Sequence, residues 1–296
     1  MTPRTLPFVW LDVFTDRPLE GNQLAVFTDA RGLSQEQMQA IARETKLSET
    51  TFIFPREPAV ELEQGVRVRI FTVDEELPFA GHPTLGTATV VRGASGADTI
   101  TLDLDAGKIP VSFRDENGLA FGEMRQRDPE FLGLHRIEDV ARATGLAAAD
   151  IDDNLPIQTV STGLPFTIVP VRSLAALQNL KFEWANAKEY LGKSGGRFFY
   201  FIARGAVNPN TDMHARMIFY GGEDPATGSA AGCGASWMVQ YGVAKPGQKV
   251  AIEQGLECGR PSRLVVSADK VGDKVTDVRV GGTSVAIMRG ELLLPS

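Results

Sequence analysis

Cysteine and histidine are scarce in this chain. Its 296 residues include two cysteines, Cys233 and Cys258, and three histidines that lie far apart in sequence. Neither residue type shows the spacing of a zinc motif or of a disulfide framework. Glycine patterns typical of nucleotide binding are missing too. The sequence therefore predicts no metal site and no cofactor.

Basic clusters and long apolar runs are also lacking. The net charge is −7 and is spread along the chain, which argues against nucleic acid or an anionic membrane surface as a partner. The apolar stretch LPFVWLDVF is interrupted by Asp12, and no run approaches the roughly 18 apolar residues that span a bilayer. We expect a soluble, cytoplasmic protein.

Short alternating segments dominate the chain. Val66, Val68 and Ile70 alternate with arginines, which is typical of a strand with one buried face. The predicted strands cover 8–14, 22–28, 51–54, 66–70, 100–104, 109–113, 165–171, 198–203, 215–219, 249–253, 263–267, 275–280 and 284–293. Because most of these strands follow one another closely, the pattern favours an α+β fold with mainly antiparallel pairing.

Helices are fewer. Ser34 and Gln37 form a capping box that predicts a helix start, and apolar residues then recur at helical spacing. The other predicted helices cover 84–92, 136–144, 174–191 and 228–241. The segment 84–92 has weak helix propensity, so its prediction depends on its likeness to 228–241.

That likeness is part of an internal repeat. The stretch GHPTLGTAT at 81–89 matches EDPATGSAA at 223–231, so that His82 corresponds to Asp224, 142 positions later. Gly21 and Gly163 have the same offset, and each is followed by a strand, a helix and an aromatic-rich strand. We interpret the chain as two copies of one α+β unit, 1–127 and 128–279, each a curved sheet around a helix of small residues. Similar turns would then meet at a cleft between the lobes.

The two turns predict an anion-binding site. The first helical amides lack acceptors within their own helix, and we expect them near Gly86 and Thr87 in one copy and near Gly228 and Ser229 in the other. Helix N-termini attract anions, and glycine lets a ligand approach the backbone closely. Together they predict a small carboxylate as the ligand.

His82 and Asp224 are the titratable residues of these turns. His82 precedes a proline, so its backbone is biased away from helix, and its pairing with Asp224 suggests acid/base or hydrogen-bonding work. Local capping is an open alternative, with Asp224 as N-cap and Pro225 as the first helical residue.

Glu49 lies just before the apolar strand 51–54. A carboxylate held against Phe52 and Phe54 would lose solvation, and its pKa would rise toward a range useful for acid/base catalysis. A solvated surface Glu is the alternative, and position alone does not decide between them.

Four stretches in both halves carry a resemblance to a known family. With DVFTDRPLEGNQLAVF, LSETTF, FAGHPTLGTA and EDPATGSAAG in this order, the chain closely resembles the phenazine-biosynthesis (PhzF-like) isomerases over nearly its whole length. The resemblance implies the diaminopimelate-epimerase fold, in which each of two similar lobes is a curved, mostly antiparallel, barrel-like sheet around a central helix. It also implies that the final strand, about 280–296, returns to the first lobe, and that the protein is a homodimer.

The resemblance also implies roles for individual residues. Glu49 matches the family's catalytic acid/base. The polar site residues and their backbone neighbours match His82, Asp224, Ser229, Gly81 and Gly228. Related epimerases use two cysteines at the facing helix starts, where this chain has His82 and Asp224, so a two-thiol mechanism is excluded.

The resulting hypothesis is a cofactor-independent isomerase. Glu49 would move a proton, and with it a double bond, on a small carboxylate. A racemase or epimerase would instead use Glu49 on one face and Asp224 or His82 on the other. A non-catalytic carboxylate-binding protein would keep the helix N-termini and would not need Glu49.

Overall fold

The structure is a computed structural model that describes residues 4–116, 118–219 and 222–294. The chain divides into two compact units, each described by itself below. Unit 1 comprises Met1–Met124 and Gly281–Ser296, and unit 2 comprises Arg125–Val280. Residues 1–3, 295 and 296, which the predicted first lobe and final strand include, lie outside the described residues.

Unit 1 is built mainly from strands. Its strands are β1 (Arg4–Val13), β2 (Asn22–Phe27), β3 (Thr50–Phe54), β4 (Val66–Phe71), β5 (Glu76–Leu77), β6 (Thr99–Leu104), β7 (Gly107–Glu116), β8 (Leu119–Arg125) and the second half of β17 (Lys274–Leu294). Its helices are α1 (Gln35–Thr45), α2 (Pro58–Gln64), α3 (Gly81–Arg92) and the short η1 (Gly93–Ser95). The predicted strands 275–280 and 284–293 are thus one continuous strand, β17.

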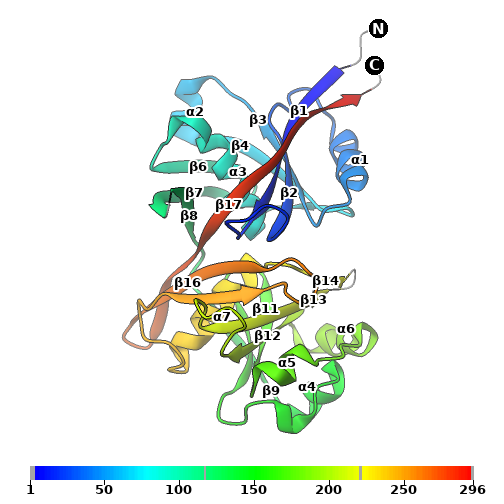
Figure 1. Ribbon diagram of the computed structural model, residues 1–296, viewed down its shortest axis with the longest axis vertical. Helices are drawn as coiled ribbons and strands as arrows, with labels where there is room; N and C mark the ends of the chain where they lie inside the picture. The colour runs from blue at the N-terminus through cyan, green and yellow to red at the C-terminus, as the bar shows by residue number, and fades with distance from the viewer. Residues whose placement is uncertain (1–3, 117, 220–221, 295–296) are drawn as a thin grey trace. The chain divides into compact units, whose positions relative to one another are not determined.

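The strands of unit 1 close into a ring. Pairing runs β1–β2–β3–β4–β6–β7–β8–β17 and returns to β1, with β2–β3 and β4–β6 parallel. The final strand therefore pairs with the first, from Arg4 opposite Leu294 to Val13 opposite Ser284 (Figure 1).

Helix α3 runs through the inside of this ring. A Cβ at Gly86 would lie within 2.9 Å of side chains of Leu11, Val13 and Leu24, and one at Gly122 of β8 would lie 2.5 Å from Leu85 of α3. Strands on several sides of the barrel thus contact one short helix. Its small residues, which weaken helix propensity, are what fit the narrow interior.

Unit 2 consists of the remaining elements. Its strands are β9 (Glu130–His135), β10 (Ile157–Ser161), β11 (Pro165–Val171), β12 (Phe198–Arg204), β13 (Met213–Phe219), β14 (Gly222–Glu223), β15 (Val250–Gln254), β16 (Ser262–Val271) and the first half of β17. Its helices are α4 (Ile137–Thr144), η2 (Ala148–Asp150), α5 (Leu174–Gln178), α6 (Trp184–Ser194) and α7 (Gly228–Gln240).

The sheet of unit 2 repeats that of unit 1 strand for strand. Its pairing runs β9–β10–β11–β12–β13–β15–β16, with β11–β12 and β13–β15 parallel, and the hairpin strand β14 follows β13 as β5 follows β4. The almost fully buried α7 corresponds to α3. The sequence repeat is therefore a structural repeat, and the α+β class is confirmed.

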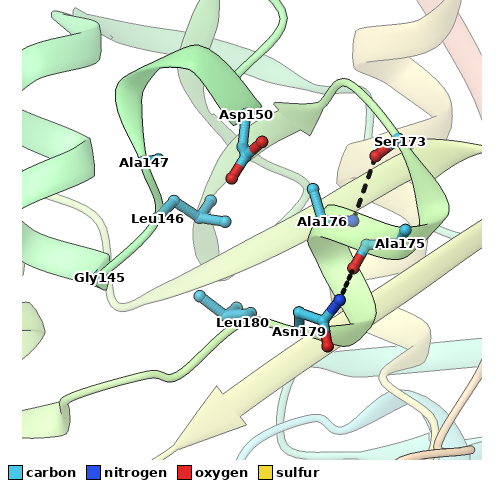
Figure 2. A pocket seen from close by; sticks show the side chains of 9 residues that line it. All are labelled: Gly145, Leu146, Ala147, Asp150, Ser173, Ala175, Ala176, Asn179 and Leu180. Carbon is cyan, nitrogen blue, oxygen red and sulfur yellow. Dashed lines mark hydrogen bonds between the residues drawn. The ribbon is translucent and has the colours of Figure 1, made fainter.

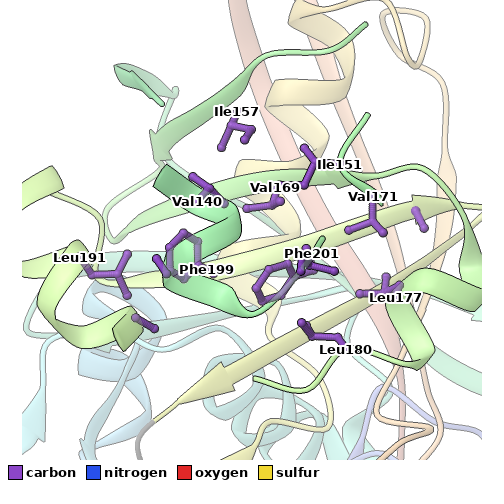
Figure 3. Close-up of a cluster of buried hydrophobic side chains, with 14 residues drawn as sticks. Val140, Ile151, Ile157, Val169, Val171, Leu177, Leu180, Leu191, Phe199 and Phe201 are labelled. Carbon is purple, nitrogen blue, oxygen red and sulfur yellow. The ribbon is translucent and has the colours of Figure 1, made fainter. Parts of the chain in front are cut away.

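Each sheet carries a second core on the face away from its central helix. In unit 2, Phe199 and Phe201 of β12 pack with residues of α4, α5 and α6 (Figure 3), and Ala203 belongs to the same cluster. Tyr200, between the two phenylalanines, contacts Gly234 of α7 on the other face. In unit 1, Met38 and Ile41 of α1 pack on the corresponding face. Burial on both faces explains why neither β3 nor β12 shows the apolar–polar alternation of a strand with one exposed face.

Four of the five predicted helices are present, although α3 starts at Gly81 and α2 was not predicted. The capping box of Ser34 and Gln37 is present at the start of α1. The predicted single helix over 174–191 is wrong, because the chain breaks into α5 and α6. Arg216 Nη1 donates to the carbonyls of Leu177 (2.9 Å), Gln178 (3.4 Å) and Leu180 (3.4 Å), which a continuous helix would use internally.

Candidate active site

Glu49 stands directly before β3. Helix α1 ends at Lys46 in the left-handed conformation, which redirects the chain, and Thr45 and Thr50 join their hydroxyls at 2.8 Å. Thr51 of β3 and Thr87 of α3 are joined in the same way, also at 2.8 Å. The first contact holds the start of β3 to the end of α1, and the second holds β3 to the central helix α3.

The sequence predicted that Glu49 contacts Phe52 and Phe54, but the two rings lie on the other face of β3. Successive side chains on a strand point to opposite faces, so Glu49 lies on the α3 side with Thr51. Phe52 faces the outer core, where its ring stacks on Phe27 at a centroid distance of 5.2 Å, and Phe54 packs at the edge of that core. The neighbour of Glu49 is instead His82.

His82 lies in the first turn of α3, beside Glu49. Glu49 Oε2 and His82 Nε2 are 3.6 Å apart, and the two side chains are 17% and 6% exposed. On the other side of the ring, Asn22 Nδ2 lies 3.3 Å from His82 Nδ1.

The imidazole is neutral. Burial lowers the pKa of His82 to about 3, although a backbone hydrogen bond at Gln23 acts in the opposite direction. His82 Nε2 makes no hydrogen bond to any residue that the structure describes. Glu49 therefore lies beside a neutral imidazole, and a reacting group placed between the two would contact both side chains.

Helix α3 begins earlier than predicted. It starts at Gly81, with Ala80 as an N-cap that makes no side-chain cap bond, so His82 is helical despite the following Pro83. Gly86 and Thr87 accordingly lie in the second turn, packed inside the barrel, and not at the helix start. Proline is tolerated in the first helical turn, where its missing N–H would have no intrahelical acceptor.

The corresponding turn in unit 2 lies just before α7 and carries Asp224. Helix α7 begins at Gly228 with Thr227 as N-cap, so the alternative in which Asp224 caps the helix is wrong. Asp224 is 7% exposed, and its Oδ2 accepts a 2.6 Å hydrogen bond from Thr227 Oγ1. Ser229 is half-buried in the first turn of α7, where no side chain caps the backbone.

A strand outside the turn holds it in place. Gln254, at the end of β15, donates from Nε2 to the carbonyl of Asp224 at 2.8 Å and to Thr227 Oγ1 at 2.9 Å. Its Oε1 also accepts from the backbone of Thr227 at 3.3 Å. The turn is therefore fixed by hydrogen bonds from the Gln254 side chain to both backbone and side-chain atoms.

The structure thus groups the predicted residues by unit. Gly81, His82 and Glu49 come together in unit 1, and Asp224, Gly228 and Ser229 come together in unit 2. Sequence reasoning missed Asn22, Thr227 and Gln254. Asn22 lies within a stretch that carries the family resemblance, whereas Gln254 is 30 positions from Asp224 and has no local signal.

Two further polar groups are buried inside unit 2. Burial raises the pKa of the Cys233 thiol to about 11, which agrees with its interpretation as a small buried thiol. Burial also raises the pKa of the Tyr200 hydroxyl far above its usual range. The Tyr200 hydroxyl makes no hydrogen bond to a residue in the described part of the chain.

A surface pocket of about 340 Å³ lies elsewhere in unit 2 (Figure 2). It is lined by the end of α4, by η2 and by α5, where Ser173 accepts from the amide of Ala176 and Asn179 donates to the carbonyl of Ala175. None of the predicted site residues lines this pocket.

Among the residues that the structure describes, no helix is long and apolar enough to span a membrane.

Comparison with known proteins identifies the family. The family model described as phenazine biosynthesis-like protein, PhzC-PhzF, matches residues 11–290. The chain belongs to this phenazine biosynthesis-like family. It is 36% identical to an uncharacterized isomerase of Mesorhizobium japonicum, over 98% of this chain and 100% of that protein. It is also 36% identical to the trans-2,3-dihydro-3-hydroxyanthranilate isomerase of Pseudomonas chlororaphis, over 97% of this chain and 99% of that protein.

Solved structures agree with this assignment. A PhzF-family phenazine biosynthesis protein from Bacillus anthracis superposes with a TM-score of 0.88 at 30% identity, over 98% of this chain and 100% of that one. A hydroxyproline epimerase from Agrobacterium vitis shares the fold, with a TM-score of 0.63 at 11% identity over 99% and 94% of the two chains. The protein is a PhzF-family isomerase, so the interpretation as a non-catalytic binder is set aside.

Proposed function

We propose that this isomerase moves a proton from one carbon to another on a small unsaturated carboxylate, with Glu49 as the acid/base. The observation that carries the proposal is the position of Glu49 Oε2, 3.6 Å from His82 Nε2 and beside the start of α3. A general base works best when it is held near its proton and only partly hydrated, and Glu49 is 17% exposed.

The proposed reaction is an allylic shift without net oxidation. The carboxylate of Glu49 takes a proton from a carbon next to the double bond, and the C–H electron pair enters the conjugated system. The protonated Glu49 then returns a proton at the far end of that system, so that the double bond moves and the atoms balance. The neutral His82 donor stabilises the charge that develops between the two steps.

Binding in this proposal depends on the two helix starts. The first turn of α3 at Gly81 and that of α7 at Gly228 and Ser229 present amide groups without side-chain caps, which suit the substrate carboxylate. Asp224, bonded to Thr227, accepts from a substrate hydroxyl or ammonium group. None of these steps requires a cofactor.

The substrate class follows from the relatives. The Pseudomonas chlororaphis relative is named for trans-2,3-dihydro-3-hydroxyanthranilate, a small ring with a carboxylate, an amino group and a hydroxyl. We propose a substrate of this class for the present chain. Epimerisation at one carbon is the rival outcome within the isomerases, and chiral analysis of the product separates it from a double-bond shift.

Glu49→Gln tests the proposal, with Glu44→Gln on the exposed face of α1 as the matched control. Small unsaturated carboxylates, including the relative's substrate, are first screened by thermal shift, because a bound ligand raises the midpoint. Turnover of a hit is then followed by NMR. We expect Glu49→Gln to lose at least ~100-fold in rate while still binding, and Glu44→Gln to keep its rate. Equal rates in both variants would refute the role of Glu49.

A further inference from the structure

His214 of β13 stands apart from the residues discussed so far. Its side chain is fully buried, yet both ring nitrogens are bonded to carboxylates. Nδ1 lies 2.7 Å from Glu253 Oε1 and Nε2 lies 2.9 Å from Glu257 Oε1. The described residues include no cluster placed to hold a metal ion, so these contacts are hydrogen bonds in their own right.

Two carboxylate acceptors require two ring donors, and only the imidazolium form has both. Burial opposes that charge, but the hydrogen bonds that the ring donates to Glu257 and Glu253, together with their negative charges, outweigh burial, and the pKa of His214 is raised. Burial raises the pKa of Glu257, but the bond to His214 and the positive charges of His214 and Arg216 together outweigh burial, and the pKa is lowered. His214 is therefore a buried cation between two anions.

The charged groups around His214 join several elements. Glu253 of β15 also accepts from the backbone amides of Val207 (2.6 Å) and Asn208 (2.9 Å). Glu257 Oε2 lies 4.0 Å from Nε of Arg216, which in turn binds Glu223 of β14 through two 2.8 Å bonds.

One titratable neighbour completes the set. The Cys258 thiol, next to Glu257, has a pKa raised by burial and by the carboxylates of Glu223 and Asp224. The groups around His214 are therefore the carboxylates of Glu253, Glu257 and Glu223, the guanidinium of Arg216 and the neutral thiol of Cys258.

The segments joined in this way flank the turn that carries Asp224. Glu223 immediately precedes Asp224, and Gln254, which bonds the turn, immediately follows Glu253. Gly255 closes the arrangement at φ +83°, and a Cβ there would lie 2.6 Å from the carbonyl oxygen of Pro225. The turn 224–228 thus rests on the strand ends that His214 and its carboxylates hold together.

We propose that His214 is a positioning residue, which sets the turn 224–228 by bridging Glu253 and Glu257. The importance of that turn for binding rests on the proposed function, whereas its dependence on His214 does not. Loss of one ring proton would remove one of the two bonds and leave negative charge in the interior that no imidazolium compensates. The turn would then open locally without unfolding of unit 2.

The direction of the pH dependence follows from the raised pKa. Such a group stabilises the fold fully below its unfolded pKa, and the stabilisation is lost as the pH rises through the folded value. Order in the turn should therefore decline on the alkaline side. His82, with a lowered pKa, acts in the opposite direction.

Hydrogen exchange of the backbone amides in 222–230 tests the proposal in the full-length protein. His214→Gln is compared with His135→Gln, a control in the same unit whose ring bonds the hydroxyls of Tyr190 and Thr159 at 2.8 Å. We expect exchange in 222–230 to rise about tenfold in His214→Gln at pH 6 and to stay unchanged in His135→Gln. In wild type, exchange corrected for its intrinsic rate should rise with pH, and this rise should be absent from His214→Gln.

Activity supplies the second arm, with the substrate identified above. We expect His214→Gln to raise KM more than it lowers kcat, and to lose the alkaline decline of the wild type. If His214→Gln does not fold, Glu257→Gln removes one of the two carboxylate partners of His214 and is measured in its place. Equal exchange and an unchanged pH profile in the His214 and His135 variants would overturn the proposal. An inactive wild type would refute the proposed function but leave the exchange result to decide on His214.

Discussion

Glu49 Oε2 and His82 Nε2 lie 3.6 Å apart, although one residue precedes a strand and the other begins a helix. The contact depends on the barrel of unit 1, in which the pair of hydroxyls at Thr51 and Thr87 joins β3 to α3. It also depends on burial, which keeps His82 neutral. The imidazole of this pair is therefore neutral, and the contact is not an ion pair.

The neutral state of His82 predicts a dependence of stability on acid. Because its folded pKa is about 3 and its ordinary value is 6.5, stability is complete above pH 6.5 and falls as the pH drops toward 3. Between pH 6.5 and 5 the free energy of unfolding should fall by about 1–2 kcal/mol from this group. Urea unfolding of wild type and His82→Gln at both pH values measures the effect. The free energy of unfolding should fall more between the two pH values in wild type than in His82→Gln. An equal fall in both proteins would contradict the assignment.

Tyr200 allows a stability test of a buried polar group. Its hydroxyl is fully buried and makes no hydrogen bond within the described residues, so Tyr200→Phe should raise the free energy of unfolding by about 1 kcal/mol. Tyr190→Phe is the control, because the Tyr190 hydroxyl bonds His135 at 2.8 Å, and its loss should cost about 1 kcal/mol. Denaturant midpoints compare the variants. A destabilised Tyr200→Phe would mean that the hydroxyl has a partner such as an enclosed water.

Much of this architecture could be predicted because the chain repeats itself. The matching turns around His82 and Asp224 identified α3 and α7 as equivalent, even though propensity alone would not have made 84–92 a helix. Local signals also predicted elements correctly. The alternation along β4 and the capping box at Ser34 both depend only on neighbouring residues.

The errors occurred where distant contacts override local pattern. Arg216 interrupts the predicted helix 174–191 by taking its carbonyls, and no residue inside that segment signals the break. Helix α3 starts at Gly81 and not at the predicted residue 84, because tertiary packing accommodates a residue before proline in helical conformation. Asn22 and Gln254 reach the candidate site only through the sheet, so sequence spacing could not reveal them.

The fate of the transferred proton tests the central claim most directly. Glu49 is 17% exposed, so its abstracted proton can exchange with water before it is returned. Turnover in deuterium oxide should therefore give wild-type product with deuterium at the newly protonated carbon, whereas Glu49→Gln should give neither product nor labelled substrate. NMR and mass spectrometry of the recovered compounds measure both. The same deuterated product, formed by Glu49→Gln at the wild-type rate, would contradict the assignment of Glu49 as the acid/base.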